Sequence, residues 1–383
     1  MIGRTQHARG ILTAALDAVT LVAATAILIA AAERPHPAAT RGERNHQADS
    51  QRGLTLSDYD PVSMLEVASD VVTKAKVPAV DFHNHINHDE PERLLHVMDA
   101  CNVAVIVNFT GGFGETLQAQ VAKFARHADR FLVFANVNWD GIDEPDFGQQ
   151  AARQLEADVK AGARGLKIFK NLGLGVKDNT GTLVAIDDRR LDPVWAKAGE
   201  LDIPVAIHTS DPDAFFLPVD RFNERYEELQ AHPDWSFHGA QFPSKATLLE
   251  QRNNVIARHP RTTFVALHVA NHAENLSEVA AWLDRYPNLY VEIGARLNEL
   301  GRQPYTARTF FVTYADRILF GVDSRPAESV YHPYFRFLET FDEHFDYFTH
   351  PRQGRWKIYG IGLPDEVLEK VYRRNARKLL RLD

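Results

Sequence analysis

Apolar and polar residues follow one another along the chain in blocks that predict strands and helices in turn. Eight short apolar runs have the composition of buried strands: residues 77–82, 103–107, 131–135, 165–169, 204–208, 263–268, 289–293 and 318–323. Continuous apolar runs of this kind are typical of parallel strands buried on both faces. A stretch with helical spacing follows each run, at residues 91–99, 114–127, 146–160, 193–200, 246–258, 276–286, 305–314 and 366–380.

Eight strand-then-helix units indicate the fold class. Such alternation predicts a parallel sheet with helices outside it, and eight units over this length match an α/β fold of the (β/α)8 TIM-barrel type. A doubly wound open sheet is the alternative, but no Gly-x-Gly-x-x-Gly turn follows the first strand. Long loops are expected after strands four, five and eight, and the last two are rich in aromatic residues. Loops of this length in a compact domain are usually functional lids.

The N-terminus differs from the rest of the chain in composition. Arg4 and Arg9 precede a stretch rich in Ala, Leu, Ile and Val that ends at Ala32, the layout of a secretory signal peptide. Asp17 interrupts this stretch, and the apolar part that follows it, residues 18–32, is shorter than the roughly 20 residues that cross a bilayer comfortably. We therefore expect a signal peptide at 1–32, a flexible linker at 33–53 and the barrel domain at 54–383.

This layout predicts a secreted or periplasmic protein with no stable membrane span after cleavage. An uncleaved membrane anchor and a cytoplasmic enzyme are the alternatives.

Charge and cysteine content exclude other classes of protein. The 383 residues include 43 Lys and Arg against 51 Asp and Glu, a net charge of −8. This balance argues against a nucleic-acid-binding protein, which needs a basic surface. The single cysteine, Cys101, permits neither an intrachain disulfide nor a cysteine-based zinc site. The expected partner is a small-molecule substrate, and formation of a homodimer is possible.

Polar side chains occur at the carboxyl ends of the predicted strands, where barrel enzymes place their chemistry. His83 and His85 lie two residues apart after the first strand, so they can bind one ion from the same side. His208, His268 and Asp323 end strands five, six and eight. Any one of these histidines could be an ordinary buried histidine. Together they predict a metal site with nitrogen and oxygen ligands, because such groups are costly to bury unpaired.

This order of residues resembles the amidohydrolase superfamily, most closely its amidohydrolase-related branch, which includes aminocarboxymuconate-semialdehyde decarboxylase and resorcylate-type decarboxylases. The resemblance covers residues 54–383. It implies one divalent metal ion, most often Zn2+ with Mn2+ as the alternative, whose ligands would be His83, His85, His208 and Asp323. It also implies that His268 is a nearby acid/base and electrostatic residue.

Such a site can support two reactions. Asp323 can pass a proton from a metal-activated water to a leaving group while His268 stabilises oxyanion charge, which is hydrolysis. The same residues can hold a substrate that loses carbon dioxide. We favour a metal-dependent hydrolase acting on a small carboxylate-bearing amide or lactone. A non-oxidative decarboxylase of an aromatic or muconate-like acid is the alternative.

Cations near the expected mouth indicate an anionic substrate. Lys167 on strand four, and Arg296 and Arg325 after strands seven and eight, are the predicted substrate-binding residues. The structural alternative is that these cations pair with nearby carboxylates: Glu292, Glu299 or Glu328. Lys167 has a further alternative, because in two-metal members of the superfamily a lysine on strand four is carboxylated and bridges the metals.

Overall fold

The computed structural model describes residues 53–55, 59, 61–347 and 353–382. The predicted signal peptide and residues 33–52 of the predicted linker lie outside the described residues. The chain divides into two units, residues 1–64 and 65–383, and the second contains the helices and strands given below. In the described part of the chain, no helix has both the length and the apolar character that crossing a membrane requires.

The strands of the described residues form two parallel sheets that together make the barrel. The first contains β1 (Ala79–Asn84), β2 (Val103–Asn108) and β3 (Phe131–Val133), and the second contains β4 (Ala135–Asn136), β5 (Leu166–Ile168), β6 (Val205–Ile207), β7 (Phe264–Ala266), β8 (Leu289–Glu292) and β9 (Ile318–Leu319). Only Phe134 separates β3 from β4, which correspond to one predicted strand. The Phe82 N–H donates to Phe320 O at 3.0 Å and the Asp323 N–H donates to His83 O at 2.9 Å, which joins β1 to the segment after β9. The predicted (β/α)8 barrel is confirmed.

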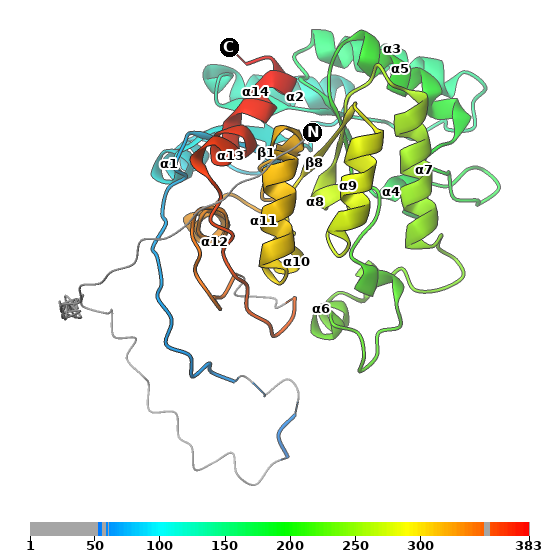
Figure 1. The fold of residues 1–383 in the computed structure, drawn as a ribbon. Helices are drawn as coiled ribbons and strands as arrows, with labels where there is room; N and C mark the ends of the chain where they lie inside the picture. The colour runs from blue at the N-terminus through cyan, green and yellow to red at the C-terminus, as the bar shows by residue number, and fades with distance from the viewer. Residues whose placement is uncertain (1–52, 56–58, 60, 348–352, 383) are drawn as a thin grey trace, which may run out of the picture. The chain divides into compact units, whose positions relative to one another are not determined.

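Helices follow the strands and cover the outside of the barrel (Figure 1). They are α1 (Pro91–Cys101), α2 (Gly114–Phe124), α3 (Phe147–Lys160), α5 (Asp192–Glu200), α7 (Lys245–Arg258), α9 (Leu276–Arg285) and α11 (Pro304–Thr313). Figure 1 shows α7, α9 and α11 side by side. The predicted last helix is divided into α13 (Asp365–Glu369) and α14 (Asn375–Leu380) by a π-helical turn at 370–374.

Apolar side chains fill the inside of the barrel. Val80, Phe82, Val107 and Leu319 are buried there in one cluster, to which α14 adds Leu380. A second and larger cluster lies between the strands and the surrounding helices. Because both faces of the strands are apolar, polar side chains at the strand ends are the exception, and they form the site described below.

The segment after the last strand is not the long loop that was predicted. It contains α12 (Glu328–Glu339), which buries Tyr331, Tyr334, Phe335 and Leu338 at helical spacing. Pro333 lies inside this helix and obscured the pattern, because proline usually breaks a helix interior. Four more short helices were not predicted: α4 (Asn171–Leu174), α6 (Tyr226–Ala231), α8 (Leu267–Ala270) and α10 (Leu297–Gly301).

The predicted lid after β6 is attached to the barrel by buried charges. Nη1 of Arg225 lies 2.7 Å from Oε2 of Glu228 in α6, and the same guanidinium pairs with Glu299 of α10. All three side chains are buried. A second arginine, Arg302, pairs with Glu224 at 2.9 Å. The lid is therefore fixed at its α6 end, and Glu299 is used here rather than by a cation of the predicted site.

Candidate metal centre and substrate site

Three of the predicted ligands meet at the carboxyl ends of β1 and β9. Nε2 of His83 and Nε2 of His85 each lie 3.2 Å from Oδ1 of Asp323. The ligand atoms of these three residues all lie within 4.8 Å of one another. His83 is buried, whereas the side chains of His85 and Asp323 are 38% and 22% exposed. The group can therefore be reached from solvent on the side of His85.

An irregular pairing of β1 directs His83 into this group. The register between β1 and β2 shifts between Asp81 and Asn84, and such irregularities re-aim side chains. Phe82 and His83 are neighbours in the chain, yet both rings pack against Phe109, with centroid distances of 5.7 and 4.7 Å. Regular strand alternation would have placed these two side chains on opposite faces.

Three histidines have their second ring nitrogen bonded to the protein. The partners of Nδ1 are Glu292 Oε2 for His83 at 2.9 Å, Gly294 O for His268 at 2.8 Å and Thr110 Oγ1 for His85 at 2.5 Å. This leaves each Nε2 directed at Asp323, the arrangement usual for histidines that bind a metal. Nε2 of His83 and Nε2 of His268 are buried with no hydrogen-bond partner among the described residues. Buried nitrogens without partners are costly, so the donor set fits a divalent cation.

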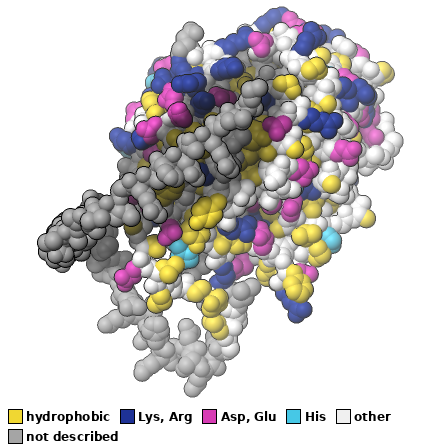
Figure 2. Space-filling view, viewed as in Figure 1, with side chains coloured by type: hydrophobic (Ala, Val, Ile, Leu, Met, Phe, Trp, Pro, Cys, Tyr) yellow, Lys and Arg dark blue, Asp and Glu magenta, His cyan; other side chains and the backbone are white. Residues whose placement is uncertain are grey.

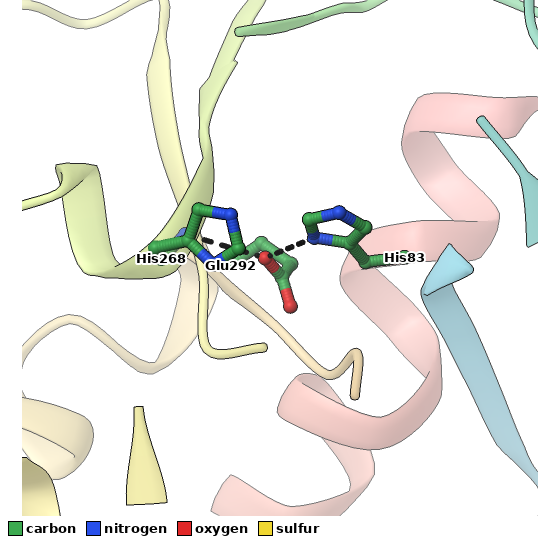
Figure 3. A group of neighbouring side chains, drawn as sticks. All are labelled: His83, His268 and Glu292. Atoms are coloured by element: carbon green, nitrogen blue, oxygen red, sulfur yellow. Dashed lines mark hydrogen bonds and ion pairs between the residues drawn. The ribbon is translucent and has the colours of Figure 1, made fainter. Parts of the chain in front are cut away.

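Glu292 at the end of β8 contacts two of the predicted site residues, an arrangement that the sequence did not reveal. Figure 3 shows its carboxylate between His83 and His268. Oε2 lies 2.9 Å from His83 Nδ1 and accepts the His268 N–H at 3.3 Å. A Cβ on Gly294 or Gly321 would collide with Oε1 of the same carboxylate. The only signal in the sequence was an acidic residue at the end of an apolar strand.

His208 lies beside the group but has a different orientation. Its ring centroid is 4.3 Å from that of His268. Its Nε2, however, lies 3.0 Å from Ser210 O and 3.5 Å from Asp211 Oδ1. Within the described residues, His208 is not part of a three-residue group that could bind an ion. Its role as a ligand stays a prediction.

Burial and neighbouring charges set the protonation states at the site. Burial alone would raise the pKa of Asp323, but interactions with His83 and His85 hold this pKa well below its usual range. Burial lowers the pKa of His208 to about 4. Burial, together with the neighbouring His208, also holds the pKa of His268 well below its usual value. At neutral pH, Asp323 is therefore a carboxylate and the imidazoles of His208 and His268 are neutral, the forms that bind cations.

Two of the predicted substrate-binding residues are buried basic side chains. Lys167 is 1% exposed and Arg296 is 5% exposed. Lys167 Nζ has no hydrogen-bond partner in the described part of the chain, and it lies 4.8 and 5.1 Å from the ring centroids of Phe109 and Phe169. Burial lowers the pKa of Lys167 to about 7, against the effect of two nearby carboxylates. The Arg296 guanidinium donates to Ala295 O at 2.7 Å, and it forms no ion pair within the described residues.

The third predicted cation, Arg325, is placed differently. Its side chain is 71% exposed, and its Nε lies 2.7 Å from Asp89 Oδ1. Arg93 binds the same carboxylate oxygen at 2.6 Å. Figure 2 shows Lys and Arg side chains interspersed with Asp and Glu on the face in view. Because Arg325 is exposed and already paired, it can contribute only at the rim of the site.

Comparison with known proteins gives a family and a fold. A family model described as amidohydrolase matches residues 76–382. A solved structure of 2,6-dihydroxybenzoate decarboxylase with 2,6-dihydroxybenzoate has a TM-score of 0.51 at 18% identity, over 80% of this chain and 99% of that one. A putative amidohydrolase from Staphylococcus aureus has a TM-score of 0.51 at 17% identity, over 79% and 99% of the two chains. At these identities the likeness shows a shared fold alone. The curated proteins gave no match.

Proposed function

Because the chain belongs to the amidohydrolase family of metal-dependent enzymes, we propose that it hydrolyses a small carboxylate-bearing molecule such as an amide or a lactone. The observation that carries this proposal is an ionised carboxylate at the centre of three imidazoles. Asp323 lies 3.2 Å from His83 and from His85, and 3.6 Å from His268. We also propose that one divalent ion, Zn2+ with Mn2+ as the alternative, is bound by His83, His85 and Asp323, with His208 as the fourth ligand.

The reaction needs a base, a proton donor and a place for the substrate oxygen. A divalent ion, when bound, polarises that oxygen and lowers the pKa of a coordinated water from about 15.7 towards about 7. Asp323 is ionised, so it can accept the proton of the attacking water and pass it to the leaving nitrogen or oxygen. The low pKa of His268 keeps its ring neutral, so its Nε2, which has no partner among the described residues, can accept a hydrogen bond from the attacking water and orient it.

The buried cations support an anionic substrate. Lys167 and Arg296 are removed from water next to the centre, and no carboxylate of the described residues neutralises either at ion-pair distance. A substrate carboxylate would raise the lowered pKa of Lys167, keep this side chain protonated, and give both side chains the charge-assisted hydrogen bonds that burial removed.

Decarboxylation is the second candidate, and the same two cations favour it. Lys167 and Arg296 lie beside the centre, so they could hold a carboxylate attached to the reacting carbon of an aromatic or muconate-like acid. In that reaction Asp323 would have to deliver a proton to carbon. Hydrolysis asks Asp323 only to move a proton between oxygen or nitrogen atoms, which is faster than proton delivery to carbon, and for this reason we favour it.

Isotope labelling separates the two reactions. The purified protein, loaded with zinc or manganese, is incubated in H2(18)O with carboxylate-bearing lactones and amides and with aromatic acids. Hydrolysis places one 18O atom in the product acid, whereas decarboxylation releases carbon dioxide and leaves no label in the organic product. Asp323→Asn is the control for background reaction. Release of carbon dioxide without label in the organic product would refute the proposal.

We further propose export to a secreted or periplasmic location. The arginines and the apolar stretch that precede Ala32 support it. N-terminal sequencing of protein expressed with its complete N-terminus tests this proposal. A mature chain that begins at Glu33 is the expected result, and retention of residues 1–32 would favour the membrane anchor or the cytoplasmic enzyme.

A further inference from the structure

Two tyrosines of α12 lie behind the predicted metal ligands. Tyr331 and Tyr334 are one helical turn apart, and both are buried. Their rings pack around Phe320, the residue after β9, with centroid distances of 6.5 and 5.9 Å. The packing fixes the rings, so the two hydroxyl groups have defined positions among the strand ends.

The Tyr334 hydroxyl connects two segments of the site. It donates to Val322 O at 3.1 Å and accepts the Ala295 N–H at 2.8 Å. Val322 immediately precedes Asp323, and Ala295 follows Gly294, whose carbonyl binds His268. One hydroxyl thus holds the backbone beside the Asp323 carboxylate and beside the carbonyl that orients His268.

The Tyr331 hydroxyl acts through Asp81. It donates to Asp81 Oδ2 at 2.7 Å. The other oxygen of this carboxylate accepts the N–H of His83 and the N–H of Val322, each at 3.2 Å. Asp81 is completely buried. The hydrogen-bonded pair of Tyr331 and Asp81 therefore joins the strand that carries His83 to Val322, the residue before Asp323.

The segments held in this way have an unusual backbone. Asp323 has φ +51° and Ala295 has φ +53°, in the left-handed region that residues other than glycine rarely adopt. Such conformations persist where the surrounding structure over-determines them. The hydrogen bonds of Tyr331 and Tyr334 lie next to both residues.

We propose that Tyr331 and Tyr334 are positioning residues whose hydroxyl groups hold Asp323 and His83 in the orientation that binds the metal. Neither hydroxyl contacts a reacting atom. The effect on metal binding rests on the proposed metal site, whereas the effect on the strand ends does not. Loss of supporting hydrogen bonds of this kind typically weakens metal binding about 10–100-fold.

Phenylalanine substitutions test the proposal, because they keep the ring and remove only the hydroxyl. The variants are Tyr331→Phe and Tyr334→Phe. The matched control is Tyr372→Phe, since Tyr372 is also buried and its hydroxyl bonds Glu339 Oε1 at 2.9 Å, outside the predicted ligand set. Zinc affinity is measured by competition with a chromophoric chelator. We expect a loss of about 10–100-fold in the first two variants and wild-type affinity in the control.

Hydrogen exchange of the metal-free proteins is the second measurement. Mass spectrometry of peptides that cover residues 290–325 should show faster exchange around Ala295 in Tyr334→Phe and around Val322 in Tyr331→Phe, but not in Tyr372→Phe. Wild-type exchange and wild-type zinc affinity in both variants would overturn the inference, as would equal losses in all three. If the wild-type protein binds no metal, the proposed metal site is refuted, and the exchange rates still decide the role of the tyrosines.

Discussion

On the side of β1, β8 and β9, carboxylates bind the imidazoles directly: Glu292 and Asp323 lie 2.9 and 3.2 Å from the two ring nitrogens of His83. On the side of β5 and β6, Lys167 has no hydrogen-bond partner among the described residues, and His208 bonds to Ser210 O in its own loop. The first side orients its polar groups through the protein itself. The second side leaves polar groups for a ligand to satisfy. We infer that the first side supplies three of the four proposed metal ligands, and that the second side, apart from His208, receives the substrate.

Replacing the carboxylate shared by the first side should have the largest effect. Asp323→Asn keeps the shape of the side chain but removes the base, so kcat should fall by about 10²–10⁴. Steady-state kinetics on a substrate found by the labelling experiment measure the change. Activity within a few-fold of wild type would mean that a residue on the other side of the site, rather than Asp323, acts as the base.

Glu292 and Asp211, one carboxylate from each side of the site, offer the sharpest comparison. Glu292→Gln removes the negative charge of the group that accepts from His83 Nδ1, so it should weaken metal binding about 10–100-fold. Asp211→Asn alters the carboxylate next to His208. It should weaken metal binding less than Glu292→Gln does, because His208 is not grouped with the other ligands among the described residues. Zinc titrations of both variants measure this. Equal losses would mean that the second side also fixes the metal.

A glycine next to Glu292 tests how tightly the first side is packed. A Cβ at Gly321 would collide with the Glu292 carboxylate and lie 2.8 Å from His83 Cβ. Gly321→Ala should therefore lower the free energy of unfolding by about 1–3 kcal/mol. The control is Gly175→Ala, where the nearest atom is 3.6 Å away. Urea unfolding compares the two, and a similar loss in both would show that the packing at Gly321 is not special.

The exposed cation should have the smallest effect. Arg325→Ala removes an exposed cation, and its buried partner Asp89 keeps its second pairing with Arg93, so KM should change less than about five-fold. Lys167→Met, which removes a buried cation of the second side, should raise the KM of a carboxylate-bearing substrate by a larger factor. A larger change in KM for Arg325→Ala than for Lys167→Met would mean that the substrate binds at the rim of the site.

The sequence predicted the barrel well because burial on both faces gives parallel strands a simple apolar signature. It also identified the strand-end residues that the fold brings together, since His83, His85, His268 and Asp323 interrupt that signature. The orientation of His208 depends on its own loop and was not visible in the residue pattern. Its place among the ligands, like the other assigned roles, awaits the experiments above.

Contacts between distant residues were beyond the sequence. The pairing of Arg325 with Asp89 joins residues 236 positions apart, and no local pattern announces it. α12 was missed because Pro333 interrupts an otherwise helical aromatic stripe. The role of Glu292 depends on the irregular pairing of β1, which follows from the assembled barrel rather than from local periodicity.

The placement of Lys167 between two aromatic rings has a consequence for how the protein would respond to its medium. Dissolved ions weaken attraction between charges that lie in water, with a screening length of about 8 Å at physiological ionic strength. Small counterions cannot surround an amine that is 1% exposed and flanked by Phe109 and Phe169. The attraction of its protonated form for an anion inside the site would persist at high salt concentration, whereas that of the exposed Arg325 would weaken. Binding of an anionic molecule should therefore depend only weakly on added salt.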